Sequence, residues 1–127
     1  MSETRKLAAI LAADALTGAV RMAPRESHRE SLMTAYVIFD VEIHDMARYQ
    51  EFMAGVKPAL EAAGARYLAR GGAHTVYEGD WEPRRLVLVE FPSSKAADDF
   101  YNSETYRRLK AIRDECSSAR IVVVEGV

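Results

Sequence analysis

The sequence has little cysteine, no long apolar run and no excess of charge of either sign. The single cysteine, Cys116, excludes an internal disulfide and suits a reducing compartment. No apolar run approaches the roughly 20 residues that span a bilayer. Lysine and arginine number 17 against 19 aspartates and glutamates, for a net charge of −2. We therefore expect a cytoplasmic protein with neither a nucleic-acid nor a membrane partner.

Motifs that hold metals or phosphates are also missing. The three histidines, His28, His44 and His74, form no HxH or HxxxH pair, so we expect no zinc site. The RGG segment that ends at residue 72 contains a glycine pair. It lacks the GxxxxGK[ST] pattern, and the sequence predicts no helix after it. We expect no cofactor.

Strands are predicted from alternating apolar side chains. In AYVIFDVEI, residues 35–43, every second residue is apolar and directed to one face. RRLVLVEF, residues 84–91, and ARIVVVEG, residues 119–126, show the same pattern. ARYLARGG and HTVYEG, within residues 65–79, predict a further strand region that is bent or bulged at Gly71-Gly72.

Helices are predicted between these strands. Asp45 is a suitable N-cap for a helix with one apolar stripe that ends near Gly64, and Pro58 should kink or split it. Ser94 is the expected cap of a second helix through Tyr101. Ser103 is the expected cap of a third helical piece, which runs to about residue 113.

The order β-α-β-β-α-β predicts an α+β, ferredoxin-like domain with its helices on one face of an antiparallel sheet. The other face would carry Ile38, Leu86, Leu88, Ile121 and Val123. An apolar face of this size marks an interface. We therefore expect a homodimer that forms through the sheet faces.

The first 34 residues differ from this pattern. Residues 23–34 are polar and read as a linker, so we expect a domain at 35–127 preceded by an extension, helical or disordered, at 1–34. LAAILAADAL resembles the core of a signal peptide, but Asp14 interrupts it.

Several segments of the domain carry a family resemblance: AYVIFDVEIHD, GARYLARGGAHTVYEGDW, RRLVLVEFPS, FYNSETYRRL and IVVVEG. They resemble the domain of unknown function 1330 family of the dimeric α+β barrel superfamily, over residues 35–127. The resemblance implies a ferredoxin-like protomer and a dimer whose sheets form a barrel. It implies no particular reaction. The superfamily includes cofactor-independent monooxygenases, haem-degrading enzymes, lactone isomerases and stress-responsive proteins.

A second resemblance covers RKLAAILAAD, residues 5–14, which is similar to the opening strand of a class III adenylate/guanylate cyclase domain. The aspartate that matches Asp14 would bind a catalytic metal there. The following ALTGAVRM departs from the family's pattern, and no second metal-binding aspartate can be placed. A two-metal site needs several acidic ligands, so we reject cyclase activity.

Two residues are candidates for catalysis. Glu90 follows Leu86 and Leu88 on one strand face, and a carboxylate among apolar neighbours can exchange protons near neutrality. His74 could act as a general base. The alternatives stay open: His74 is structural, or Glu90 pairs with an arginine in a wet dimer interface.

Three further residues are candidates for binding a substrate. Arg70 could clamp a carboxylate, although a salt bridge to Glu78 or Glu90 is the favoured alternative. Tyr49 could line a pocket between helix and sheet, and Asp40 lies on the same strand face as Glu42. These residues predict a pocket for a small, partly apolar molecule. A cofactor-free oxygenase or isomerase, a non-catalytic binding protein and an accessory module remain as alternatives.

Overall fold

The computed structural model describes residues 33–127, so the cyclase-like segment and nearly all of the expected extension lie outside the described residues. The elements are β1 (Ala35–Ile43), α4 (Met46–Ala62), β2 (Arg66–Arg70), β3 (Leu86–Phe91), α5 (Ser94–Tyr101), α6 (Glu104–Cys116) and β4 (Ser117–Glu125). Within this part of the chain, no helix is long and apolar enough to cross a membrane.

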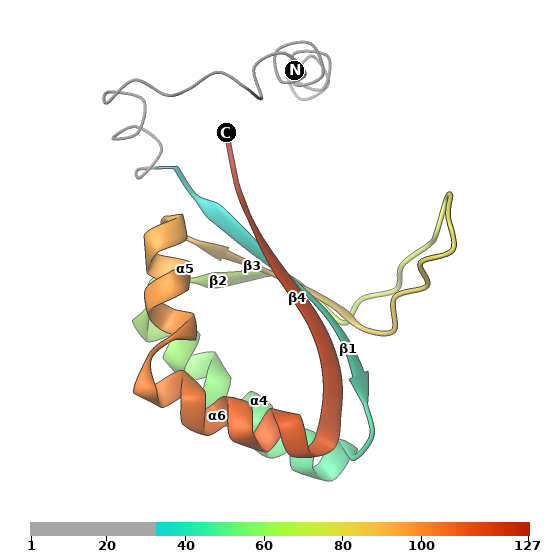
Figure 1. Ribbon diagram of the computed structural model, residues 1–127, viewed down its shortest axis with the longest axis horizontal. Coiled ribbons are helices and arrows are strands. Elements are labelled where there is room, and N and C mark those ends of the chain that lie inside the picture. The colour runs from blue at the N-terminus through green and yellow to red at the C-terminus, as the bar shows by residue number, and fades with distance from the viewer. Residues whose placement is uncertain (1–32) are drawn as a thin grey trace. The chain divides into compact units, whose positions relative to one another are not determined.

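The strands form one antiparallel sheet in the order β2-β3-β1-β4. The three helices lie on one face of this sheet (Figure 1). The predicted α+β, ferredoxin-like arrangement is therefore confirmed. The segment between β2 and β3, residues 71–85, extends away from the helices.

The helix ends follow the capping residues, with one correction. Asp45 accepts a hydrogen bond from the Arg48 amide (3.2 Å), and Ser103 accepts one from the Tyr106 amide (3.1 Å), as predicted. The cap of α5 is Ser93 instead of Ser94, because the Ser93 hydroxyl accepts from the Ala96 amide at 3.0 Å.

Pro58 does not split α4, which runs unbroken for 17 residues. Pro58 and Ala54 are both exposed. The Ala54 carbonyl, which loses its helical donor to the proline ring, can therefore bind water instead.

The core lies between the helices and the sheet. Its buried side chains include Val37, Val41, Tyr49, Phe52, Val56, Leu60, Val87, Val89, Phe91 and Tyr106. Burying such apolar side chains stabilises the fold by roughly 1.5–3 kcal/mol each.

The register of β4 corrects the expected composition of the sheet's uncovered face. Ile121 pairs with Phe39 and Val123 with Val37, so both lie on the face that carries the helices. Val122 and Val124, 57% and 51% exposed, lie on the uncovered face instead. Residues 121–124 of β4 are all apolar, so their sequence shows no alternation between the two faces of the sheet. Only the pairing of β4 with β1 shows which of these side chains lies on which face.

The strand predicted from HTVYEG does not form, because β2 ends at Arg70. The bulge also lies elsewhere, between Tyr67 and Ala69 and not at the glycines. Gly71 has a φ of 71°, a conformation that glycine adopts without strain. Its N–H donates to the Leu86 carbonyl at 2.8 Å, and the chain then leaves the sheet.

Candidate functional site

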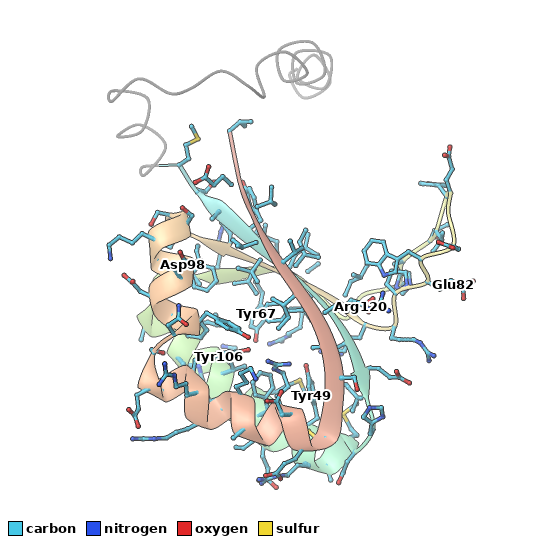
Figure 2. All side chains as sticks on the ribbon, viewed as in Figure 1. Tyr49, Tyr67, Glu82, Asp98, Tyr106 and Arg120 are labelled. Atoms are coloured by element: carbon cyan, nitrogen blue, oxygen red, sulfur yellow. The ribbon has the colours of Figure 1, made fainter. Side chains whose placement is uncertain are left out.

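A cavity of about 30 Å³ lies between the sheet and the helices. Figure 2 shows Tyr49, Tyr67 and Tyr106 in the space that separates these layers. The apolar lining of the cavity comprises Phe39, Phe52, Met53, Val56, Leu60, Val87, Val89 and Phe100. A space of this volume holds about one or two water molecules.

Among the described residues, three arginines line this cavity, and no aspartate or glutamate does. Arg70 is the last residue of β2, Arg85 precedes β3, and Arg113 lies in the last turn of α6. Together they give a small, mostly apolar cavity three positive charges, because arginine stays protonated in proteins.

Arg113 is the most deeply buried of the three, with 3% of its surface exposed. Its Nε has no hydrogen-bond partner among the described residues. Its one ion-pair contact within residues 33–127 is long, 3.9 Å from Nη1 to Asp114 Oδ1. The guanidinium also lies 5.9 Å from the centre of the Phe52 ring, within range of a cation–π interaction.

Arg85 is half-buried, and its Nε is likewise without a partner among residues 33–127. Its Nη2 is 3.8 Å from the Met53 sulfur, which is a weak acceptor. The guanidinium packs against Gly71, where a Cβ would overlap it. Gly71 is thus needed both for its backbone conformation and for the space in which Arg85 lies.

The neighbouring glycines allow a matched test of this role. Gly71→Ala is expected to lower the free energy of unfolding by about 1–2 kcal/mol, because alanine is strained at positive φ and its Cβ displaces Arg85. Gly72→Ala should change it by less than about 0.5 kcal/mol, since a Cβ there meets nothing within 4 Å. Urea unfolding of both variants measures the difference, and equal stabilities would contradict the role of Gly71.

Arg70 does not form the favoured salt bridge to Glu78 or Glu90. Its guanidinium instead lies over the Tyr67 ring, 4.6 Å from the ring centre. Arg70 is exposed, yet it lines the cavity. It therefore forms the part of the lining that faces solvent.

Tyr49 and Tyr106 are the buried hydroxyl-bearing residues of the cavity. Burial raises the pKa of each, and the positive charge of Arg113 opposes this rise in both. The Arg85 charge adds to that opposition at Tyr49. The Tyr106 hydroxyl is buried near the Arg113 guanidinium and makes no close hydrogen bond to any described residue, so it can bond to a molecule in the cavity.

The structure separates the predicted site residues. Arg70 and Tyr49 line the cavity together, whereas Glu90 lies on the opposite face of the sheet and pairs with Arg66 at 2.6 Å. His74 is exposed in the segment between β2 and β3. Glu90 thus pairs with an arginine, as one alternative predicted, and neither candidate for proton transfer reaches the cavity.

Asp40 also lies on the uncovered face, where it anchors the segment before β3. Trp81 Nε1–H donates to Asp40 Oδ2 at 2.8 Å, and the Arg84 amide donates to Oδ1 at 2.9 Å. Desolvation acts to raise the pKa of Asp40. These hydrogen bonds and the charge of Arg120 outweigh it, so the pKa is lowered. Trp81 thus reaches β1, which is an inner strand of the sheet.

Cys116 is not part of the cavity. It is buried at the end of α6, and its thiol donates to the Ile112 carbonyl at 3.3 Å. Burial raises the pKa of this thiol, which suits the predicted structural role.

No group of three or more histidine, cysteine, aspartate or glutamate side chains in residues 33–127 could hold a metal ion.

Sequence reasoning missed Arg85, Arg113 and Tyr106. A signal existed for Arg113, which follows Leu109 by four residues and Tyr106 by seven. That spacing places it on the apolar stripe of α6, and a charged residue on such a stripe indicates either a buried pair or a function. No comparable signal marks Arg85, which precedes its strand.

The sequence model of the DUF1330 family, described as a domain of unknown function, matches residues 34–127. The chain belongs to this family. The match does not reach residues 5–14, so it gives the cyclase resemblance no support. No curated protein sequence shows significant similarity to the chain.

Solved structures share the fold of this DUF1330 domain at low sequence identity. A protein of unknown function from Rhodopseudomonas palustris superposes with a TM-score of 0.64 at 13% identity, covering 85% of this chain and 96% of its own. SnoaB, a cofactor-independent oxygenase from Streptomyces nogalater, gives 0.53 at 6% identity, with 75% and 94% covered. A dimeric ferredoxin-like protein from Jannaschia gives 0.52 at 19% identity, with 74% and 98% covered.

Proposed function

We propose that residues 35–127 form a binding domain for a small, partly apolar molecule and that residues 1–34 are an extension outside it. The molecule would occupy the cavity between the sheet and the helices and contact Arg70 and Tyr49. The observation that carries this proposal is the composition of the lining, in which a few polar groups converge in an apolar cavity. Binding sites for small molecules typically have this composition.

The present volume of about 30 Å³ requires the cavity to open for an organic ligand. Arg70 is the side chain best suited to open it, because it is long, exposed and held by a ring contact instead of a salt bridge. Rotation of this side chain into solvent would join the cavity to the surface. Side chains at the surface rotate on the picosecond-to-nanosecond timescale.

Catalysis is a second candidate function, as a cofactor-independent oxygenase or isomerase. The observation that favours it is the cluster of three arginines, whose positive charge would stabilise a substrate anion formed by loss of a proton. The fold shared with the Streptomyces nogalater oxygenase is compatible with this candidate. His74 could accept the proton only from a substrate that extends beyond the cavity, and the sheet separates Glu90 from the cavity.

We also propose that the domain works as a homodimer with the uncovered sheet faces together. That face carries Ile38, Leu86, Leu88, Val122 and Val124. In a protomer alone, these apolar side chains would remain against water. The likeness to a dimeric ferredoxin-like protein supports a homodimer.

Native mass spectrometry of the full chain, purified from its own host without added ligand, tests the binding proposal. We expect a reproducible additional mass on the wild-type protein. A Val56→Phe variant, whose added ring fills the cavity, should lose that mass. This variant should remain folded, with a cost of about 1–3 kcal/mol for overpacking. A wild-type protein that never carries an additional mass would contradict the proposal, as would equal retention by both proteins.

A further inference from the structure

We propose that the molecule in this cavity is a monocarboxylate with a compact apolar body, held through Arg85 and Arg113 and admitted by movement of Arg70. This inference rests on the proposed function, namely that the cavity binds a ligand. It adds the chemical class of the ligand and assigns a role to two arginines that the sequence did not single out.

The first argument is the charge of the cavity. Several surface cations of the same domain have carboxylate partners, as in Lys57–Glu61, Arg66–Glu90 and Lys95–Asp99. Arg85 has no such partner among residues 33–127, and Arg113 has only the 3.9 Å contact to Asp114. A cation withdrawn from water is unfavourable unless an anion or several acceptors compensate it. A bound anion would supply this compensation.

The second argument is the inventory of hydrogen-bonding groups. The buried groups without a partner in the described part of the chain are Arg85 Nε, Arg113 Nε and the Tyr106 hydroxyl. Both guanidinium groups can only donate, so the missing component is an acceptor. A carboxylate accepts through two oxygens, and its plane matches the fork of donors on a guanidinium.

The third argument is the apolar remainder of the lining. Phe52, Val56, Leu60 and Val87 surround the space beside the guanidinium groups. An inorganic anion would compensate the charge but would leave these side chains without a partner. A carboxylate with an aromatic ring or a short alkyl chain would contact both parts of the lining.

Arg70 would control access without providing the main charge contact. It is exposed and stacks on Tyr67, whereas Arg113 is almost completely buried. Removing the Arg70 side chain should therefore speed association of the ligand, while the preference for a negative charge should remain with Arg85 and Arg113.

The test compares carboxylates with uncharged molecules of the same shape. The probes are benzoate and hexanoate, with benzamide and hexanamide as their neutral counterparts. They are titrated into the ¹⁵N-labelled full chain, and binding is followed by NMR chemical-shift changes. For wild-type protein, we expect the carboxylates to bind at least about tenfold more tightly than the amides, the ratio typical of one charge-assisted contact.

The Arg113→Gln and Arg85→Gln variants should each reduce the ratio of carboxylate affinity to amide affinity to about twofold or less. The amide spectrum of each variant checks that it is folded. Arg107→Gln is the matched control, because Arg107 lies on the same helix, is exposed and forms no ion pair with another described residue. Arg113→Lys keeps the charge and should retain part of the preference. Arg70→Ala should keep the ratio and raise the association rate.

The outcomes separate the two proposals. If amides bind as tightly as carboxylates, the inference on ligand class is wrong, while the proposed binding function stands. If no probe shifts resonances of cavity residues, both are wrong. If Arg107→Gln lowers the ratio as much as Arg113→Gln, the charge effect is general and the assignment to the cavity fails.

Discussion

Val122→Arg is expected to convert the protein from a dimer to a monomer. Val122 is 57% exposed in the protomer and pairs with Ile38 in the sheet, so an arginine there leaves the protomer fold intact. In a dimer with the sheet faces together, the new charges would be withdrawn from water close to apolar side chains. A penalty of roughly 3 kcal/mol or more would raise the dimer dissociation constant by at least about 100-fold.

Analytical ultracentrifugation at micromolar concentration measures this change. Val127→Arg is the matched control, because Val127 follows the end of β4 and is 91% exposed. It should remain a dimer. A wild-type protein that sediments as a monomer would contradict the proposed dimer, and a Val122→Arg protein that stays dimeric would show that another surface forms the interface.

Arg113→Met is expected to raise the free energy of unfolding of the ligand-free protein by about 1–4 kcal/mol, the range found when a buried ion pair is replaced by apolar residues of similar volume. The reason is that Arg113 is buried and, in the part of the chain that the structure describes, its Nε has no partner and its ion pair with Asp114 is long. Methionine fills a similar volume and needs no acceptor. A residue that costs stability is retained for what it binds.

Chemical denaturation of the ligand-free variant and wild type measures this effect. Arg107→Met is the control on the same helix, and it should change stability by less than about 0.5 kcal/mol because Arg107 is exposed. A clear loss of stability in Arg113→Met would identify Arg113 as a structural residue. It would also remove the main support for a ligand anion in the cavity.

The candidate site was only partly predictable, and its residues show why. Tyr49 lies on the apolar stripe of a helix, so its direction toward the sheet followed from helical periodicity. Arg70 could be placed on a strand, but whether it paired with Glu78 or turned to Tyr67 depended on where β2 ended. Glu90 was correctly assigned to the face opposite Val89. That face turned out to be the one away from the cavity.

The sequence by itself determined the order of elements, most caps, the antiparallel ferredoxin-like fold and the family, because periodicity, capping residues and turn residues act over a few positions. Tertiary structure decided the register of β4, the end of β2 at Arg70 and the meeting of Arg70, Arg85 and Arg113 at one cavity. These three arginines come from two strand ends and a helix. Their proximity depends on how the layers pack, which no local pattern of residues encodes.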